Sequence, residues 1–160
     1  MVGFGLDVHD KETRSRNMKA IKSKDTKPEL FVRKLLHNNG YRYRVAPQEL
    51  PGKPDVWLAK WNTAIFINGC FWHGHECKLF RLPKTRAKFW EDKIRKNKTR
   101  DAVKKQELRC SGIRVLTIWE CSLKGKGKLS DKILLTLIKI WFMCYETEAE
   151  ITSEGLLLRS

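Results

Sequence analysis

Hydrophobic residues recur at helical spacing in four stretches of the chain. These stretches are residues 10–24, 27–39, 86–109 and 130–145. The first has only a thin apolar stripe around Met18, so its polar side is free to face solvent or phosphates. The second has the clearest start, because Thr26 can cap a helix and Glu29 can reach back to that cap. The pattern therefore predicts a thinly packed N-terminal helix, a long charged surface helix at 86–109 and two further helices.

Four shorter stretches have the alternating or continuously apolar pattern of strands. They are residues 41–45, 55–59, 63–67 and 113–119. The second and third are joined by a turn near residues 60–62, which predicts a hairpin. Residues 147–160 have no informative pattern, and we expect a weakly packed C-terminal tail there. The order of elements predicts one mixed α/β domain over residues 1–160, with helices covering a central sheet.

The charge balance indicates which classes of molecule this domain can bind. With 33 Lys and Arg against 18 Asp and Glu, the formal net charge is +15, which attracts polyanions such as nucleic acid. A membrane-binding basic helix would gather these charges in one segment, whereas here they are spread from Lys11 to Lys139. No secretory signal is visible in residues 1–16, and the longest apolar stretch is too short to span a bilayer. We therefore expect an intracellular nucleic-acid-binding protein that makes no membrane contact.

Cysteine and histidine are concentrated directly after the predicted strand 63–67. In a reducing compartment this spacing favours metal ligation over disulfides. Tetrahedral zinc takes four sulfur or nitrogen ligands, and we predict Cys70, His75, Cys77 and Cys121. Four protein ligands leave no open position, so this zinc would be structural. Two alternatives stay open: His73 in place of His75, or buried free cysteines with no ion. The remaining cysteines, Cys110 and Cys144, are assigned to packing.

Two residues outside this ligand set suggest hydrolytic chemistry. Asp55 precedes an apolar strand in a very basic chain, and magnesium requires carboxylate oxygens. An unligated His73 would be held by the neighbouring cluster and could accept a proton from water. An aspartate before two apolar strands resembles the core of restriction-endonuclease-like nucleases. Those enzymes usually carry another acid and a lysine on the second strand, whereas this strand runs into Asn68 with neither.

A group of longer motifs accounts for that departure. They are Pro51-Gly52-Lys53-Pro54-Asp55, Phe66-Ile67-Asn68-Gly69-Cys70-Phe71-Trp72-His73, Cys77 and Trp119-Glu120-Cys121. With these motifs the chain resembles the very short patch repair (Vsr) endonucleases over nearly its whole length, to about Leu137. The resemblance implies a Mg-dependent DNA mismatch endonuclease with a restriction-endonuclease-like core. Such an enzyme hydrolyses the phosphodiester 5′ of the thymine in a T·G mismatch that arises when 5-methylcytosine deaminates. It implies a monomer in the bacterial cytoplasm, associated with the nucleoid, with double-stranded DNA as partner and mismatch-repair proteins as candidate partners.

The resemblance also assigns roles to individual residues. Asp55 matches the magnesium-binding aspartate, and the backbone carbonyl of Ile67 matches a second protein contact to that metal. His73 matches the general base, and Asp101 matches a supporting acid on the long helix. Glu29 matches a further acidic position near the site, with helix capping as the equally supported alternative. For Asp101 the alternative is an ordinary surface charge.

Asn68 stands where the family can carry a histidine. An amide can hold a water or a phosphate, but it cannot shuttle a proton at neutral pH. Asn68 is therefore predicted as a catalytic-site residue that holds water or phosphate, while a secondary proton-relay role at this position stays open.

Aromatic side chains near the cluster are predicted to read the mismatch. By resemblance, Phe71, Trp72 and Trp90 insert between base pairs beside it, and Met18 inserts from the opposite groove. Core packing is the alternative for each of these side chains. Basic residues around them are expected to contact phosphates. These are Lys78, Arg81, Lys84, Arg86, Lys93, Arg95, Lys96, Lys98 and Arg100.

Two other functions remain possible at the level of sequence. One is a non-catalytic, zinc-stabilised mismatch-binding protein, in which the altered strand end no longer supports magnesium binding. The other is a restriction nuclease that cuts both strands of matched DNA, although nothing in the sequence indicates the dimer interface that such enzymes usually need.

Overall fold

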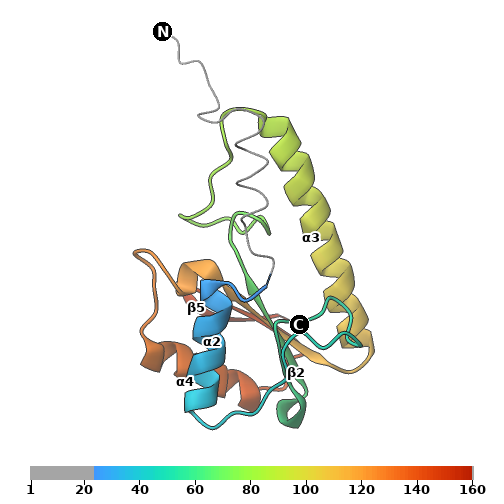
Figure 1. Cartoon of the computed structure of the whole chain (residues 1–160), viewed down its shortest axis with the longest axis vertical. Helices are drawn as coiled ribbons and strands as arrows, with labels where there is room; N and C mark the ends of the chain where they lie inside the picture. Colours follow the sequence, from blue (N-terminus) through green and yellow to red (C-terminus); the bar gives the residue numbers. More distant parts are fainter. Residues whose placement is uncertain (1–23, 160) are drawn as a thin grey trace.

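The computed structural model describes residues 24–159, which form three α-helices and a five-stranded sheet (Figure 1). The helices are α2 (Lys27–Asn38), α3 (Ala87–Cys110) and α4 (Asp131–Met143). The strands are β1 (Val56–Leu58), β2 (Thr63–Asn68), β3 (Arg114–Trp119), β4 (Glu148–Thr152) and β5 (Gly155–Arg159). Short 3-10 turns, η1 (Ala59–Trp61) and η2 (Glu120–Ser122), follow β1 and β3. The predicted helices 27–39, 86–109 and 130–145 are confirmed to within about two residues at each end.

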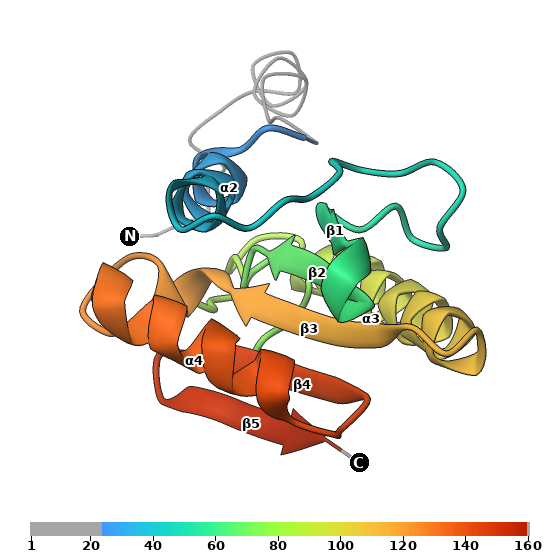
Figure 2. The same cartoon turned by 90° about the horizontal axis from the view of Figure 1, so that it is seen from below.

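The strands follow one another across the sheet in chain order, as Figure 2 shows. β1 and β2 pair antiparallel, which confirms the predicted hairpin. β2, β3 and β4 are parallel to one another, and β5 returns antiparallel to β4. The mixed α/β class is therefore confirmed for the described residues. Parallel pairing brings the carboxyl ends of β2 and β3 together at one edge of the sheet, where the functional motifs begin.

Helices cover both faces of the sheet. On one face, α2 and α4 pack their apolar sides onto the strands and bury residues such as Leu36, Ile138 and Trp141 completely. On the other face, Leu108 near the end of α3 packs against Ala64 and Val115. Each helix buries part of its predicted apolar stripe, whereas Leu30 of α2 and Phe89 of α3 are exposed. The main core lies between the sheet and the α2–α4 layer.

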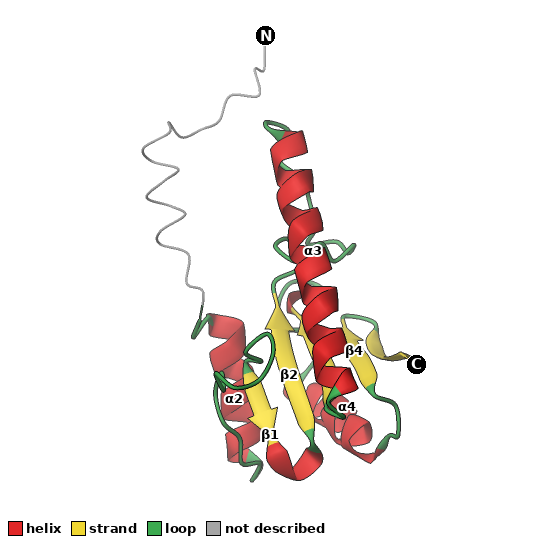
Figure 3. Ribbon diagram, turned by 90° about the vertical axis from the view of Figure 1, so that its right-hand side faces the viewer, coloured by secondary structure: helices red, strands yellow, loops and turns green. Residues whose placement is uncertain are grey.

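Only part of α3 lies on the sheet. Figure 3 shows its N-terminal half extending beyond the strand ends, alongside the loop that follows β2. Within α3, Ile94 and Leu108 are buried and most other side chains are polar. The prediction of a long charged surface helix is confirmed, and its free half is available to contact another molecule.

The predicted strand 41–45 is wrong. This segment forms a single bridge, in which Arg44 and Trp57 exchange backbone hydrogen bonds of 2.9 and 2.8 Å. Pairing cannot continue because Ala46 has a positive φ of 45° and Pro47 has no N–H to donate. The aromatic residues of this segment pack against the core instead of forming a strand.

The expectation of a weakly packed tail at 147–160 is also wrong. Residues 148–159 form β4 and β5, and Ala149 and Ile151 of β4 are fully buried. Alternation along β4 sends Glu148 and Glu150 to the opposite face, where basic side chains pair with them. The strand was not predicted because its two glutamates looked solvent-exposed, and the basic residues that pair with them are distant in the sequence.

The predicted helix at 10–24, including Met18, lies outside the described residues except for Lys24. Its DNA contact therefore remains a prediction.

Candidate active site and metal centre

Asp55 lies immediately before β1, beside the carboxyl end of β2. Its Oδ2 accepts a hydrogen bond of 2.7 Å from the backbone N–H of Ile67. Burial raises the pKa of Asp55 from 3.8 to about 7, although the Ile67 bond opposes this rise. The contact observed to Ile67 is through its amide, so the predicted metal contact through its carbonyl remains a prediction. Because burial makes the charged form of the Asp55 carboxylate unfavourable, a nearby cation would stabilise that charged form strongly.

Glu29 in the first turn of α2 adds negative charge near Asp55. Its side chain is almost fully buried, and its charge raises the Asp55 pKa further. Its carboxylate accepts from the backbone N–H of Asp25 at 2.8 Å and from Arg33 at 3.2 Å. The Glu29 amide in turn donates to the Thr26 hydroxyl at 3.4 Å. Glu29 therefore has a capping role and also acts on the field at Asp55, so the two interpretations are compatible.

The side chains of His73 and Asp101 form a hydrogen-bonded pair in the site. Nδ1 of His73 lies 2.5 Å from Oδ2 of Asp101, although 28 residues separate the two in sequence. Each side chain is 29% exposed, so water can reach both. A carboxylate can only accept this hydrogen bond, which leaves the other ring nitrogen, Nε2, free as a base. The charge of His73 also lowers the Asp55 pKa. Asp55 bonds Ile67, and the next residue, Asn68, lines a cavity with His73, so both groups lie near the carboxyl end of β2.

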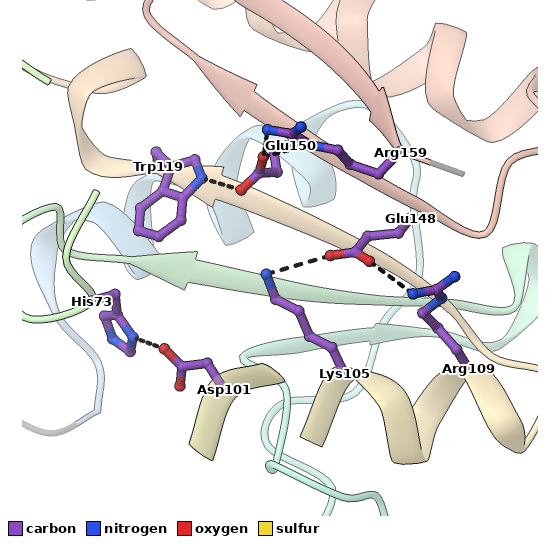
Figure 4. A network of polar contacts seen from close by, with 8 residues as sticks. All are labelled: His73, Asp101, Lys105, Arg109, Trp119, Glu148, Glu150 and Arg159. Carbon is purple, nitrogen blue, oxygen red and sulfur yellow. Dashed lines mark hydrogen bonds and ion pairs between the residues drawn. The ribbon is translucent and has the colours of Figure 1, made fainter. Parts of the chain in front are cut away.

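A cavity of about 370 Å³ opens beside this pair. Asn68, the last residue of β2, lines it together with His73 and Asp101 and is itself 6% exposed. Figure 4 shows the wall opposite α3, where Trp119 and Glu150 lie. Asn68 is thus next to the predicted catalytic pair, and its role there remains a prediction.

The four predicted zinc ligands converge at the carboxyl ends of β2 and β3. Asn68 and Trp119 are paired in register, and Cys70 and Cys121 each follow two residues later. The loop after β2 returns to bring His75 and Cys77 to the same place, and the ligand atoms of all four residues lie within 4.8 Å of one another. Among the described residues, this is the one group of histidine, cysteine or acidic side chains whose ligand atoms lie close enough together to hold a metal ion. We call residues 69–80 the Cys/His loop.

The geometry and protonation of these groups fit zinc. Nδ1 of His75 lies 3.5 Å from the sulfur of Cys70 and 3.7 Å from that of Cys121. Tetrahedral coordination at ordinary Zn–S and Zn–N lengths puts such atoms about 3.6 Å apart. Burial lowers the pKa of His75 and keeps it neutral, as a ligand must be. Burial raises the pKa of the Cys70 thiol, so a cation is needed to hold it as a thiolate.

The aromatic residues predicted to insert into DNA form one cluster between the Cys/His loop and α3. The ring centroid of Phe71 is 5.2 Å from that of Trp72 and 5.5 Å from that of Trp90. All three are partly exposed, and Phe80 and Phe89 extend the cluster. The cluster is therefore neither a closed core nor a set of isolated surface rings.

Basic side chains surround the aromatic cluster on the loop and on the free half of α3. Those predicted to meet phosphates are exposed, apart from Lys93, which is partly exposed. They are Lys78, Arg81, Lys84, Arg86, Lys93, Arg95, Lys96, Lys98 and Arg100. A polyanion could approach this surface without displacing the protein core.

Comparisons with known proteins agree with this arrangement. The family described as DNA mismatch endonuclease Vsr matches residues 6–79. The DNA mismatch endonuclease Vsr of Escherichia coli (strain K12) is 43% identical over 95% of this chain and 97% of its own length. This chain belongs to the Vsr family.

Two further relatives are named as nicking enzymes. The type II nicking enzyme V.NmeAIP of Neisseria meningitidis is 43% identical over 79% of this chain and 91% of its own length. The type II nicking enzyme V.HpaIIP of Haemophilus parainfluenzae is 36% identical over 80% of this chain and 93% of its own length. Within residues 24–159, every helix is too short or too polar to cross a bilayer.

Sequence reasoning missed several residues of the site. Arg33, buried beside Glu29, could have been found because the two are four residues apart on one helix. Glu150 and Arg159 had no such signal, since they lie in the segment for which no strand was predicted. Trp119 was noted as part of a family motif, but its position against both histidines depends on the sheet.

Proposed function

We propose that this Vsr-family chain is a DNA mismatch endonuclease that nicks one strand of a duplex 5′ of the thymine in a T·G mismatch. The observation that carries this proposal is the hydrogen-bonded His73–Asp101 pair at the same end of β2 as the partly buried Asp55. The names of the relatives support the reaction class, since they describe a mismatch endonuclease and nicking enzymes. The strongly basic composition supports DNA as the substrate.

The residues of the site suit hydrolysis of a phosphodiester. His73, with its Nδ1–H donated to Asp101, presents a basic nitrogen that can take a proton from an attacking water. Asp101 holds the ring in one tautomer and favours the imidazolium that results. Asn68 can donate its amide N–H to a phosphate oxygen or a water in the adjoining cavity.

Two metal ions complete the proposal. Asp55 and the carbonyl of Ile67 would hold magnesium, because a partly buried carboxylate next to Glu29 favours a hard cation. When bound, magnesium polarises the phosphate and offsets charge on the leaving oxygen. Cys70, His75, Cys77 and Cys121 would hold zinc, which ties the Cys/His loop to the end of β3.

Mismatch selectivity is assigned to the aromatic cluster. Insertion of Phe71, Trp72 and Trp90 costs base unstacking, and a wobble pair is easier to open than a matched pair. The exposed basic side chains then bind phosphates without reading sequence. Met18 from the N-terminal segment would act from the other groove.

We also propose a restriction-endonuclease-like core, a monomer, and a site of action in the bacterial cytoplasm at the nucleoid. The strand–turn–strand unit that begins at Asp55, continued by the parallel strand β3, supports the core assignment. Mismatch-repair proteins are candidate partners in the repair that follows the nick.

The test is a set of end-labelled duplexes with T·G, A·T or G·C at one position, incubated with and without magnesium. We expect one nick, in the thymine strand, only with the mismatch and the metal. Asp55→Asn and His73→Ala should lower the nicking rate at least about 100-fold, while mismatch affinity changes little. Asp131→Asn and His37→Ala are matched controls, since both residues are exposed, on α4 and α2, and take part in none of the contacts described for the site. Full activity in either site variant would defeat the residue assignment.

A non-catalytic mismatch-binding protein is the second candidate, because the second strand lacks the acid and lysine usual in related nucleases. This candidate predicts tight binding to the T·G duplex and no magnesium-dependent nick. The same experiment therefore separates the two functions.

A further inference from the structure

Trp119 at the end of β3 lies between the two histidines of the Cys/His loop. Its ring is stacked on His75, with centroids 4.3 Å apart and planes at 11°. Its edge meets His73 at 6.4 Å and 68°. The 6.4 Å separation lies within the roughly 4.5–7 Å over which aromatic rings attract one another, and the 4.3 Å stack is slightly closer. The indole therefore contacts a predicted metal ligand on one side and the predicted general base on the other.

The orientation of this indole is set by the C-terminal hairpin. Nε1 of Trp119 donates a 2.9 Å hydrogen bond to Oε1 of Glu150 on β4. The other carboxylate oxygen accepts two hydrogen bonds from Arg159 on β5, at 3.0 and 2.8 Å. Figure 4 shows Arg159, Glu150 and Trp119 connected in a row toward His73. A forked guanidinium–carboxylate contact has little freedom to rotate, so the acceptor that the indole meets is held in place.

The His73 ring consequently has two supports. Asp101 on α3 holds its Nδ1 and fixes the tautomer, while Trp119 on β3 limits the tilt of its plane. The first support belongs to the proposed mechanism, but the second depends on residues that have no part in the chemistry. The side chains of Asp101, Trp119 and Glu150 all line the cavity beside His73.

We propose that Glu150 and Arg159 are positioning residues for the nicking reaction, which act through Trp119 to orient the imidazole of His73. This inference rests on the proposed function. It makes the hairpin of β4 and β5 part of the active site, although no atom of Glu150 or Arg159 touches the reacting phosphate in this scheme. Arg159 should contribute less than Glu150, because Glu150 is the direct partner of the indole.

The test compares Glu150→Ala with Glu150→Gln in the full-length, zinc-loaded protein. Alanine removes the indole acceptor, whereas glutamine keeps an oxygen in its place. We expect Glu150→Ala to lower the single-turnover nicking rate roughly 10- to 100-fold, since small misplacement of a catalytic group is costly. Glu150→Gln should stay within about threefold of wild type, because the neutral acceptor still bonds the indole. Affinity for the mismatched duplex should not change.

Glu154→Gln is the matched control. Glu154 lies exposed in the turn of the same hairpin, so its substitution removes the same charge without touching Trp119. We expect wild-type rates from it. The inference is overturned if Glu150→Ala nicks at the wild-type rate, if Glu150→Gln is as slow as Glu150→Ala, or if the loss of rate merely follows a loss of bound zinc.

A second readout does not require catalysis. Nitrogen-15 spectra report the Trp119 indole N–H and the tautomer of His73, with the signals assigned from Trp119→Phe and His73→Ala. In Glu150→Ala the indole signal should lose its hydrogen-bonded shift, and the His73 signals should show averaging that is absent from wild type and Glu150→Gln. If wild type does not nick the T·G duplex, the proposed function fails while this readout still decides the positioning role. Unchanged His73 signals in Glu150→Ala would overturn the inference by themselves.

Discussion

Asp55 and His73 face the same region of the molecule, but they are held by parts that differ in construction. Asp55 sits on the sheet, where its carboxylate bonds the backbone of β2 and the strands bury a large apolar core. His73 belongs to the Cys/His loop, beneath which Cys70, Trp119 and Cys121 form a small buried cluster. The loop touches α3 where that helix has already left the sheet, through the Asn97 amide that bonds the Trp72 carbonyl at 2.9 Å.

This difference indicates how each half of the site keeps its geometry. Apolar burial stabilises the Asp55 half without help from a ligand. The His73 half buries little apolar surface beneath the roughly twelve residues of the Cys/His loop, so we propose that a bound metal supplies that order. Removal of the metal should therefore disorder the His73 half while the Asp55 half stays folded. The expected effects of single substitutions on the two halves run from the largest to the smallest.

Cys121→Ser should have the largest effect, because it removes a predicted zinc ligand that lies outside the main core. Structural zinc contributes on the order of 10 kcal/mol to such sites. We expect loss of bound zinc, nicking reduced at least about 100-fold, and loss of hydrogen-exchange protection in residues 69–98. The measurements are zinc content, nicking rate and exchange by mass spectrometry.

Cys110→Ser is the control for this change, since Cys110 is exposed at the end of α3. Protection in β2, β3 and α4 should survive in both variants. A simultaneous loss of protection in the sheet of Cys121→Ser would show that the two halves are one cooperative unit.

Leu116→Ala tests the opposite half. Leu116 is fully buried in β3 at the centre of the main core, and its truncation should cost about 3 kcal/mol of global stability. If zinc and the end of β3 fix the Cys/His loop as proposed, zinc content at low temperature should remain that of wild type. Chemical denaturation monitored by circular dichroism measures the first quantity. Unchanged stability would contradict the assignment of the core.

Asp55→Asn should stabilise the protein when no divalent cation is present. Burial raises the pKa of Asp55 from 3.8 to about 7, so the folded state binds the proton more tightly than the unfolded state. Wild-type stability from this group is full below pH 3.8, falls as the pH rises toward 7, and stays reduced above it. The full linkage would approach 4 kcal/mol, but Asp55 is partly exposed, so we expect a gain of roughly 2 kcal/mol in the variant at pH 8.

The difference between wild type and Asp55→Asn should disappear below about pH 4, where both states of wild type are protonated. Added magnesium should stabilise wild type and not the variant at pH 8. Denaturation series at several pH values, with and without magnesium, measure both effects. A variant less stable than wild type at pH 8 without metal would mean that the Asp55 carboxylate is not destabilised by burial.

Gly74→Ala should have the smallest effect on stability, about 1–2 kcal/mol and local to the loop. Gly74 has a positive φ of 66°, and an added Cβ would lie 2.7 Å from a methyl of Ile94 on α3. We expect the loop to shift from α3 and nicking to slow, with global stability nearly unchanged. Gly112→Ala separates strain from contact, because Gly112 has a φ of 78° and nothing within 4 Å of the added Cβ. Equal effects of the two substitutions on nicking would argue against the loop–helix contact.

Much of the fold was predictable because its signals are local. The caps of α2 and α4 are a threonine and a serine whose hydroxyls accept from the helix backbone, and both helices begin within one residue of the predicted position. The predicted zinc set was also readable, since three ligands lie within eight residues and the fourth follows the adjacent parallel strand. Capping and short-range spacing depend on chain geometry over a few residues.

The C-terminal hairpin shows where local signals fail. The segment Glu148-Ala149-Glu150-Ile151 alternates as a strand should, but its polar residues looked like those of a solvated tail. Lys105 and Arg109 on α3 partner one glutamate and Arg159 the other, so the strand is stable only with those neighbours in place. The opposite error occurred at residues 41–45. Their pattern predicted a strand, but backbone pairing does not continue beyond the bridge at Arg44.

By itself the sequence determined which of the described segments become helices, which two strands form the hairpin, and which sulfur and nitrogen atoms gather after the second strand. The tertiary structure decided the protonation of Asp55, the support of His73 by Trp119, and the entry of the last residues into the sheet. Periodicity and capping act between neighbours along the chain and can be read from it directly. Burial and charge pairing depend on groups brought together from distant positions, so they exist only once the strands have packed.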